Sequence, residues 1–412
     1  MTTKHTFTTP PQPYTIAVPE ADVADLHRRL DQARWPAQDV VPLEPGKEKQ
    51  KSSFGMGAGP QLDLMRELAA EWRKYSWKET EDYLNVFNHY TVEIEGLRIH
   101  FLHERSSRPD AIPLILCHGW PGAFHEFLHA IPLLTEPTAP DAQAFHVVIP
   151  SMPGYTFSSP PRTPKWGMED TARVYDKLMT GLGYESYVAQ GGDWGSVTAR
   201  CLGALHKENC NAVHLNFCPA RPPAPFSWFN PRTLLAWTPR ALLPDDQRAK
   251  LERGLDYVEK GSSYYMMQSL TPRTPAYGLN DSPVGLLAWI GEKMIPSIER
   301  ASSQTKPTLN RDALFMTLSL YWYTGSIGSS FLPYALNPHL SHFLSDPKYH
   351  LPNFALSSFP DEIFTPPARD AARTGNLKWT KEAAEGGHFA ALEKPEIFVE
   401  HLREAVPVLL KA

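Results

Sequence analysis

The chain has 412 residues and a hydrophobic content of 42%, enough for one large domain with an insertion or for two domains. Its 40 basic and 45 acidic residues give a net charge of −5 without a basic tract, which argues against nucleic acid or an anionic membrane as a partner. No apolar run approaches the roughly 18 residues of a membrane-spanning helix, and the polar N-terminus lacks the apolar core of a secretion signal. The four cysteines have no C-x-x-C spacing, so we expect neither disulfides nor zinc, and a reducing, cytoplasmic setting.

Two helical patterns lie within residues 1–90, which we expect to form an N-terminal helical meander. Apolar residues recur at helical spacing in Glu20–Ala33 and again in Leu62–Tyr75. Between them, the glycine-rich run Gly55–Pro60 lacks the spacing of a phosphate-binding loop, so we interpret it as a connector.

From residue 91 onward the pattern changes to short strands. Residues 91–103 alternate as a hairpin that turns at Glu95-Gly96. Short apolar runs then follow at Ile112–Cys117, Phe145–Ile149, Tyr187–Ala189 and Ala212–Phe217. Helical patterns separate most of these runs, which is typical of an α/β fold with a mostly parallel sheet covered on both faces.

Residues 220–345 interrupt this alternation and are predicted to be mainly helical. They begin with the proline-rich stretch Arg221–Phe226 and are rich in Tyr, Trp and Met. Strand patterns resume at Asn353–Ser357 and Leu377–Thr380, and a final helix begins at Pro395. Residues 91–219 and 346–412 are therefore predicted to be two parts of one α/β core, with the helical insertion over the carboxyl ends of the strands.

The stretch G-G-D-W-G, Gly191–Gly195, places one carboxylate in a crowded turn between a strand and a helix. Small residues two before and two after a central residue are typical of a nucleophile elbow, a strained turn that exposes one side chain. The simpler interpretation is that Asp193 caps the following helix. Taken alone, the motif does not decide between these alternatives.

The stretch H-G-W-P-G, His118–Gly122, follows the predicted strand Ile112–Cys117. The loop at this place in a nucleophile-elbow fold supplies one backbone N–H to an oxyanion hole, and the residue after the nucleophile supplies another. These donors are predicted to be the amides of Trp120 and Trp194.

A third motif, E-G-G-H-F-A, places His388 in a loop after the last predicted strand. This is where the base of a nucleophile–acid–base triad belongs in this chain order. Its carboxylate partner is expected after the preceding strand, where both Asp361 and Glu362 stand. The agreement of three motifs in the correct order favours Asp193 as a nucleophile.

An aspartate nucleophile restricts the class of substrate that the enzyme can attack. A carboxylate is ionised at neutral pH and can attack an sp³ carbon to form an alkyl-enzyme ester. This predicts an epoxide or an alkyl halide as substrate, without a metal or cofactor. Water activated by His388 would then hydrolyse the ester, with the oxyanion held by the two tryptophan amides.

With these motifs in place, the chain resembles the microsomal-type epoxide hydrolases of the α/β-hydrolase fold. The similarity extends over essentially the whole length, from A-R-W-P (Ala33–Pro36) to L-L-A-W-I-G-E-K (286–293) and L-Y-W-Y-T-G-S (320–326). The resemblance implies a helical cap over the core. The N-terminal membrane helix of some relatives is missing here, which implies a soluble form.

The resemblance also implies further site residues. Two cap tyrosines of the family hydrogen-bond the epoxide oxygen, and their motifs match Tyr264 and Tyr334, although Tyr265 is adjacent to the first. The family's acid position selects Glu362 over Asp361. These hydroxyls would protonate the alkoxide that leaves as the ring opens.

Three other functions are compatible with parts of this pattern. A haloalkane dehalogenase would use the same triad but not the cap tyrosines. A biosynthetic cyclase would open the epoxide with an internal hydroxyl, and an inactive binding protein would have no use for a complete motif set. The aromatic and Met-rich insertion favours a lipophilic epoxide as the small-molecule partner, and a homodimer is the hypothesis for assembly.

Overall fold

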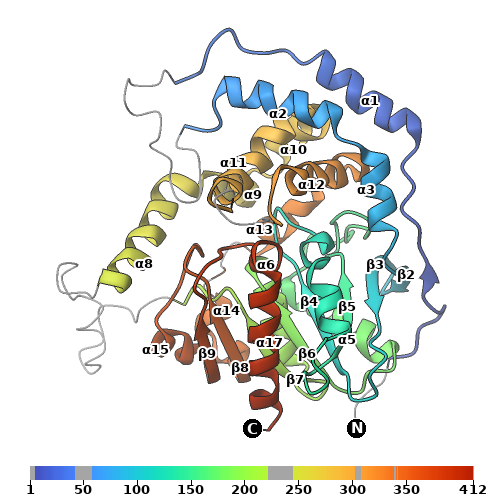
Figure 1. Ribbon diagram of the computed structural model, residues 1–412, viewed down its shortest axis with the longest axis vertical. Coiled ribbons are helices and arrows are strands. Elements are labelled where there is room, and N and C mark those ends of the chain that lie inside the picture. The colour runs from blue at the N-terminus through green and yellow to red at the C-terminus, as the bar shows by residue number, and fades with distance from the viewer. Residues whose placement is uncertain are drawn as a thin grey trace.

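The computed structural model describes residues 5–41, 58–220, 245–301, 308–337, 340 and 342–411. Within these residues, nine strands form one sheet in the order β1-β2-β3-β5-β4-β6-β7-β8-β9 (Figure 1). The strands are β1 (Gln12–Pro13), β2 (His89–Ile94), β3 (Leu97–Glu104), β4 (Ile112–Cys117), β5 (Phe145–Pro150), β6 (Tyr187–Gly191), β7 (Cys210–Leu215), β8 (Leu351–Ser358) and β9 (Gly375–Glu382). The pairs from β5 through β4 to β9 are parallel, whereas β1, β2, β3 and β5 pair antiparallel. This confirms the predicted α/β fold with a mostly parallel sheet.

The β2–β3 hairpin turns where the sequence predicted it. Glu95 and Gly96 have φ angles of 53° and 75°, the left-handed pair that a two-residue hairpin turn requires. The predicted parallel strands are also present, although their limits differ. The strand predicted over Ala212–Phe217 begins earlier, at Cys210, and ends at Leu215, which leaves Asn216 and Phe217 in the loop at its carboxyl end.

Helices cover both faces of the sheet. Successive side chains of a strand point to opposite faces, so each strand contributes to both buried clusters. Along β4, Ile115 and Cys117 belong to one buried cluster, while Leu114 and Leu116 belong to the other. The first cluster contains the inner faces of α5 (Met168–Gly181) and α6 (Asp193–Leu205), and the second those of α4 (Ala130–Thr135) and α17 (Pro395–Leu410). Two short helices, α15 (Ala368–Ala371) and α16 (Ala390–Glu393), flank β9 in the chain.

A set of helices is inserted between the neighbouring strands β7 and β8. It comprises α8 (Asp245–Asp256), α9 (Ser263–Leu270), α10 (Arg273–Asp281), α11 (Pro283–Ala301), α12 (Arg311–Thr324), α13 (Leu332–Leu336) and α14 (His342–Ser345). In Figure 1, helices α9 to α13 lie above the sheet, at the end where α6 begins. The predicted helical cap is therefore present. Its predicted proline-rich entry, Arg221–Phe226, lies outside the described residues, as do Gly55–Gly57 of the predicted connector.

The N-terminal helices pack on the outer side of this cap. They are α1 (Glu20–Asp31), α2 (Leu62–Lys74) and α3 (Trp77–Leu84). The indole Nε1 of Trp72 donates a hydrogen bond to Ser319 Oγ of α12 at 3.0 Å, and Figure 1 shows α2 lying across the cap helices. The helices α1 and α2 confirm the two predicted patterns. Helix α3 was not predicted from the sequence; it is a short helix that begins with the side chain of Ser76 accepting a hydrogen bond from the amide of Glu79.

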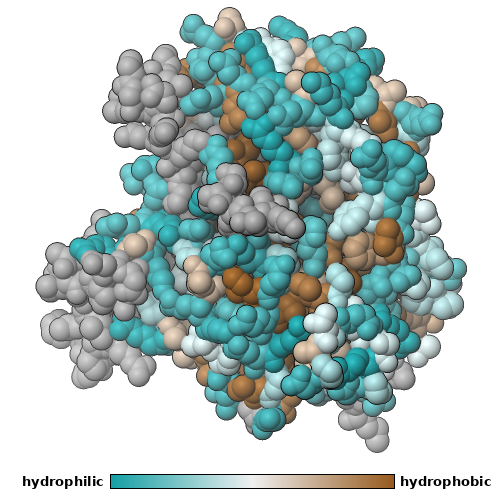
Figure 2. All heavy atoms as spheres, viewed as in Figure 1, coloured by the Kyte–Doolittle hydropathy of each residue, from teal (hydrophilic) through white to brown (hydrophobic). Residues whose placement is uncertain are grey.

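The surface agrees with a core buried between these layers. Figure 2 shows that hydrophilic residues dominate one face of the molecule, while hydrophobic residues form separate small patches on it. Scattered patches of this kind are ordinary on a globular protein.

Candidate active site

The turn between β6 and α6 holds Asp193 in a strained conformation. Its φ angle is 47°, in the left-handed region that residues other than glycine rarely occupy. A Cβ atom at Gly191 would overlap the carbonyl of Gly195, and one at Gly195 would overlap the carbonyl oxygen of Cys117. One at Gly192 would lie 2.6 Å from the side-chain nitrogen of Asn216. The glycines of the motif are therefore a steric requirement of this turn, not only a sign of flexibility.

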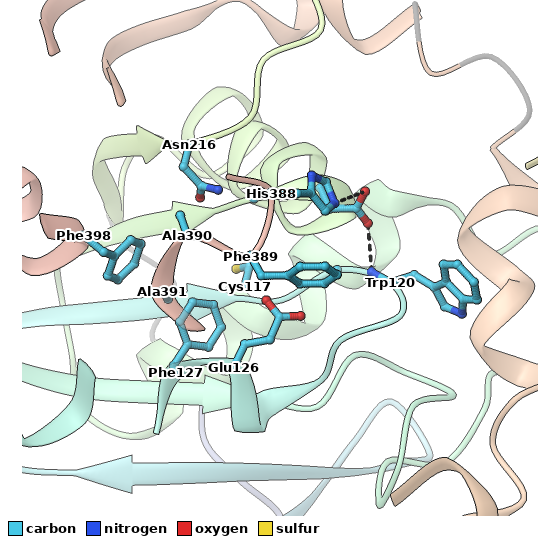
Figure 3. A pocket seen from close by; sticks show the side chains of 13 residues that line it. Cys117, Trp120, Glu126, Phe127, Asn216, His388, Phe389, Ala390, Ala391 and Phe398 are labelled. Atoms are coloured by element: carbon cyan, nitrogen blue, oxygen red, sulfur yellow. Dashed lines mark hydrogen bonds and ion pairs between the residues drawn. The ribbon is translucent and has the colours of Figure 1, made fainter. Parts of the chain in front are cut away.

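The loop after β4 brings a backbone donor to Asp193. The amide of Trp120 donates a hydrogen bond to Asp193 Oδ1 at 2.8 Å (Figure 3). A Cβ atom at Gly119 would lie 2.7 Å from Asp193 Cγ, so the loop can approach this closely only with glycine there. Trp194 is the second residue of α6, in the first turn, where helix amides lack intrahelical acceptors.

Hydrogen bonds of the His118 side chain hold this loop in place. Its Nε2 accepts a hydrogen bond from the amide of Met152 at 2.9 Å, which leaves the proton on Nδ1, 3.0 Å from the carbonyl oxygen of Gly119. Burial lowers the pKa of His118 to about 4, so the ring is neutral at ordinary pH. The first residue of H-G-W-P-G thus positions the loop and does not face the carboxylate.

The loop after β9 places His388 between two carboxylates. Its Nδ1 lies 2.7 Å from Glu362 Oε1, and its Nε2 lies 3.5 Å from Asp193 Oδ2. Glu362 is buried, whereas the side chain of Asp361 is 37% exposed and faces the guanidinium of Arg253 at 3.8 Å. The structure therefore brings Glu362, and not Asp361, to the imidazole.

The two carboxylates control the charge of His388. Burial by itself lowers the pKa of this imidazole, but the charges and hydrogen bonds of Glu362 and Asp193 outweigh burial. The net pKa of His388 lies well above its ordinary value, so the ring is a cation while both carboxylates are ionised. Removal of the charge on either carboxylate would bring this pKa down.

The two tyrosines predicted in the cap lie against the two tryptophans. The ring of Tyr264 stacks on the Trp120 indole with 5.1 Å between centroids. Tyr334 meets Trp194 edge-on at 5.0 Å and Tyr264 at 5.9 Å. Tyr265 is half-buried and also contacts the Tyr334 ring, at 5.3 Å. The structure thus brings Tyr264 and Tyr334 together against Trp120 and Trp194, with Tyr264 as the more buried of the adjacent pair.

The hydroxyl groups of these tyrosines differ in their partners. The Tyr264 hydroxyl lies 3.0 Å from that of Tyr257, whereas the buried Tyr334 hydroxyl has no hydrogen-bond partner among the described residues. Burial raises the pKa of both Tyr264 and Tyr334 well above the ordinary value, with a smaller contribution from Asp193. Both phenols therefore keep their protons. The Nζ atom of Lys293 lies 4.4 Å from the centroid of the Tyr264 ring, a cation that the sequence analysis did not place at the site.

A small cavity of about 20 Å³ lies beside Asp193 and His388. Glu126 and Asn216, which the sequence analysis did not identify, both line it (Figure 3). Asn216 follows β7 directly, and polar residues at the carboxyl end of a parallel strand were a usable signal. Glu126 lies in the 3-10 turn Phe124–Phe127 between aromatic residues and carried no such signal. Within the described part of the chain, no three His, Cys, Asp or Glu side chains are grouped as metal ligands.

Comparison with known families identifies two matching segments. Residues 11–127 match the family described as epoxide hydrolase N terminus, and residues 112–238 match the alpha/beta hydrolase fold. The first segment covers the N-terminal helices and the loop His118–Gly122. The second begins at β4 and continues through the turn that holds Asp193.

Similar proteins cover nearly the whole chain. A Stigmatella aurantiaca protein provisionally named an epoxide hydrolase is 39% identical over 95% of this chain and 84% of its own length. Epoxide hydrolase 1 of Sus scrofa is 31% identical over 97% of this chain and 89% of its own. The solved structure of Aspergillus niger epoxide hydrolase superimposes with a TM-score of 0.82 at 33% identity, covering 98% of this chain and 97% of that one. In the described residues, none of the helices combines the length and hydropathy needed to cross a membrane.

Proposed function

The chain belongs to the epoxide hydrolase family and hydrolyses epoxides, and we propose that it does so through a covalent ester on Asp193. The proposed substrate is a lipophilic epoxide, and the product is a vicinal diol. The observation that carries this proposal is the position of one carboxylate, which meets the Trp120 amide on one oxygen and His388 near the other.

In the first step, Asp193 attacks one carbon of the epoxide ring. Oδ1 is held by the Trp120 amide, so Oδ2 is the oxygen available to form the new C–O bond. The ring C–O bond breaks, and its oxygen takes a proton from the hydroxyl of Tyr264 or Tyr334. An alkoxide leaves poorly without this proton, and the buried phenols are held in their protonated form.

In the second step, water hydrolyses the ester. Ester formation removes the negative charge of Asp193, which is one of the two charges that raise the pKa of His388. The imidazolium then gives its proton to the phenolate left by ring opening, which restores the tyrosine. The neutral imidazole acts as a base toward water, with Glu362 holding it in position. The hydroxide adds to Asp193 Cγ, and the amides of Trp120 and Trp194 stabilise the oxyanion. Collapse breaks the ester bond, the diol oxygen takes up the proton, and Asp193 is restored.

The cap tyrosines favour an epoxide hydrolase over the alternatives on this scaffold. A haloalkane dehalogenase needs donors for a halide ion and has no use for two buried phenols. The Tyr334 hydroxyl, without a partner among the described residues, is free to donate to an epoxide oxygen. A cyclase would use the same residues but would need a substrate with its own hydroxyl as the second nucleophile.

A single turnover in oxygen-18 water tests the covalent mechanism, with styrene oxide as the probe and enzyme in excess. We expect the label in the peptide that contains Asp193 and not in the diol, because water attacks the carboxyl carbon. The His388→Gln variant should accumulate the ester, seen as an added substrate mass on the same peptide. A labelled diol in the first turnover, or full activity in Asp193→Asn, would refute the proposal.

Other features stay predictions from the sequence. These are a cytoplasmic location, a homodimer, and the division into a meander (1–90), two core segments (91–219 and 346–412) and a cap (220–345). Light scattering of the purified protein and separate expression of the predicted segments would test assembly and division, respectively.

A further inference from the structure

The small cavity beside Asp193 has the size of a single water site. Its volume of about 20 Å³ exceeds the roughly 10–15 Å³ that one water molecule needs. Asp193 and His388 both line it, whereas Tyr264 and Tyr334 do not. The cavity therefore lies next to the proposed ester carbonyl and is separate from the tyrosines that would meet the epoxide oxygen.

The carboxyl group of Glu126 points into this space. In Figure 3, it is directed from its 3-10 turn toward the side chains of Phe389 and Cys117, below His388. Its side chain is only partly buried, and it makes no side-chain hydrogen bond or ion pair within the described part of the chain, so the carboxyl group is available to bind water. A Cβ atom at Gly122 would overlap this carboxyl group, so the glycine of H-G-W-P-G is what gives Glu126 room to reach the cavity.

The protonation of Glu126 suits a hydrogen-bonding role. Burial raises its pKa to about 8, with His388 lowering it in part and Asp193 raising it. At neutral pH, the free enzyme therefore holds Glu126 mainly as a neutral acid, with one donor and one acceptor oxygen. A group of this kind binds water without placing a second full negative charge beside Asp193.

We propose that Glu126 and His388 together hold the water molecule that hydrolyses the Asp193 ester. A water that donates one hydrogen to His388 Nε2 and the other to a Glu126 oxygen keeps its lone pairs free to attack Cγ. The proton then moves to His388, the new C–O bond forms at Cγ, and the ester C–O bond breaks. Glu126 is not consumed in this step. The inference rests on the covalent ester of the proposed function and adds a water-positioning residue to it.

Substitutions of Glu126 separate the two half-reactions. In Glu126→Leu, which keeps the bulk but removes the polar atoms, we expect ester formation within about twofold of the parent. Ester decay should slow by roughly 10-fold or more, because the attacking water loses one of its two anchors. The ester then accumulates at steady state. Rapid quenching with styrene oxide, followed by intact-protein mass spectrometry, measures both rates.

The conservative Glu126→Gln variant provides the second readout. An amide has both a donor and an acceptor, so this variant should hydrolyse the ester faster than Glu126→Leu, which a role in packing alone would not produce. The matched control is Glu136→Leu, the same substitution at a surface residue whose side chain hydrogen-bonds Ser107 alone among the described residues. Both rates should stay at the parental value. If the leucine variant does not fold, Glu126→Ala serves the same comparison.

The outcomes distinguish this inference from the proposed function. Ester decay at the parental rate in Glu126→Leu, equal slowing of both steps, or a glutamine variant no faster than the leucine variant would overturn the role of Glu126. Absence of any ester on Asp193, including in His388→Gln, would instead refute the covalent mechanism itself.

Discussion

The core half and the cap half of the site are built from different interactions. In the core half, Asp193, His388 and Glu362 are charged groups in short contacts, held by turns whose glycines leave no spare space. In the cap half, Tyr264 and Tyr334 are uncharged and are positioned by aromatic packing, with centroids 5.0 to 6.0 Å from the tryptophans. The core half therefore contributes carboxylates and an imidazole to the site, and the cap half contributes two phenols, with the Lys293 cation beside the Tyr264 ring.

The two halves are expected to differ in their sensitivity to substitutions. Short contacts between buried charges depend steeply on position and on each partner's ionisation, since the low dielectric strengthens them. Aromatic contacts are individually weak and tolerate small shifts. We therefore expect single substitutions to be far more damaging in the core half than in the cap half.

The largest effect on activity is expected from substitution of Glu362, compared with the same change at its neighbour Asp361. Glu362→Gln should lower the rate of ester hydrolysis by roughly 10³–10⁴-fold, because the imidazole loses its orientation and the charge that stabilises its cation. Asp361→Asn is the matched control, and its hydrolysis rate should stay within about twofold of the parent. Single-turnover decay of the ester measures both. Equal losses in the two variants would mean that the contact of 2.7 Å does not define the acid.

Successive substitutions of the cap tyrosines are expected to slow ester formation in steps. Tyr264→Phe and Tyr334→Phe should each slow ester formation by roughly 10-fold, and the double variant by roughly 10²–10⁴-fold, since one phenol can still protonate the oxygen when the other is absent. Tyr265→Phe is the control and keeps its ring contact with Tyr334. The rate of ester formation, followed by rapid quenching, measures all four variants. A double variant that forms the ester at the parental rate would exclude the tyrosines as proton donors.

The smallest expected effect concerns stability and compares a glycine from each half. Gly195→Ala should lower the free energy of unfolding by about 1–3 kcal/mol, because its Cβ meets the carbonyl of Cys117. Gly278→Ala, in the cap helix α10 with nothing within 4 Å, should raise it by about 0.5–1 kcal/mol. Urea unfolding curves measure both changes. Equal effects of the two substitutions would contradict the steric account of the turn.

Local patterns in the sequence were sufficient for most of the fold. The hairpin at Glu95-Gly96 depends on a period of two and on turn chemistry, and the strand Ile112–Cys117 depends on a short continuous apolar run. All of these are properties of neighbouring residues. The prediction missed α3 because eight residues with a polar majority give a weak helical signal. The end of β7 was placed two residues late, since the apolar Phe217 continues the pattern beyond the last ladder pair at Leu215.

The sequence by itself determined the turn around Asp193 and predicted the chemistry of its carboxylate. Both depend on the backbone of a few consecutive residues and on the choice of Asp at the exposed position. The family resemblance favoured Glu362 over Asp361, and the tertiary structure placed Glu362 against His388 while Asp361 faces Arg253 on another part of the fold. Only the tertiary structure decided that the carboxyl group of Glu126 reaches the same cavity as His388. Contacts between segments so far apart in the chain leave no periodic signal along it, and they exist only once the strands and loops have been packed together.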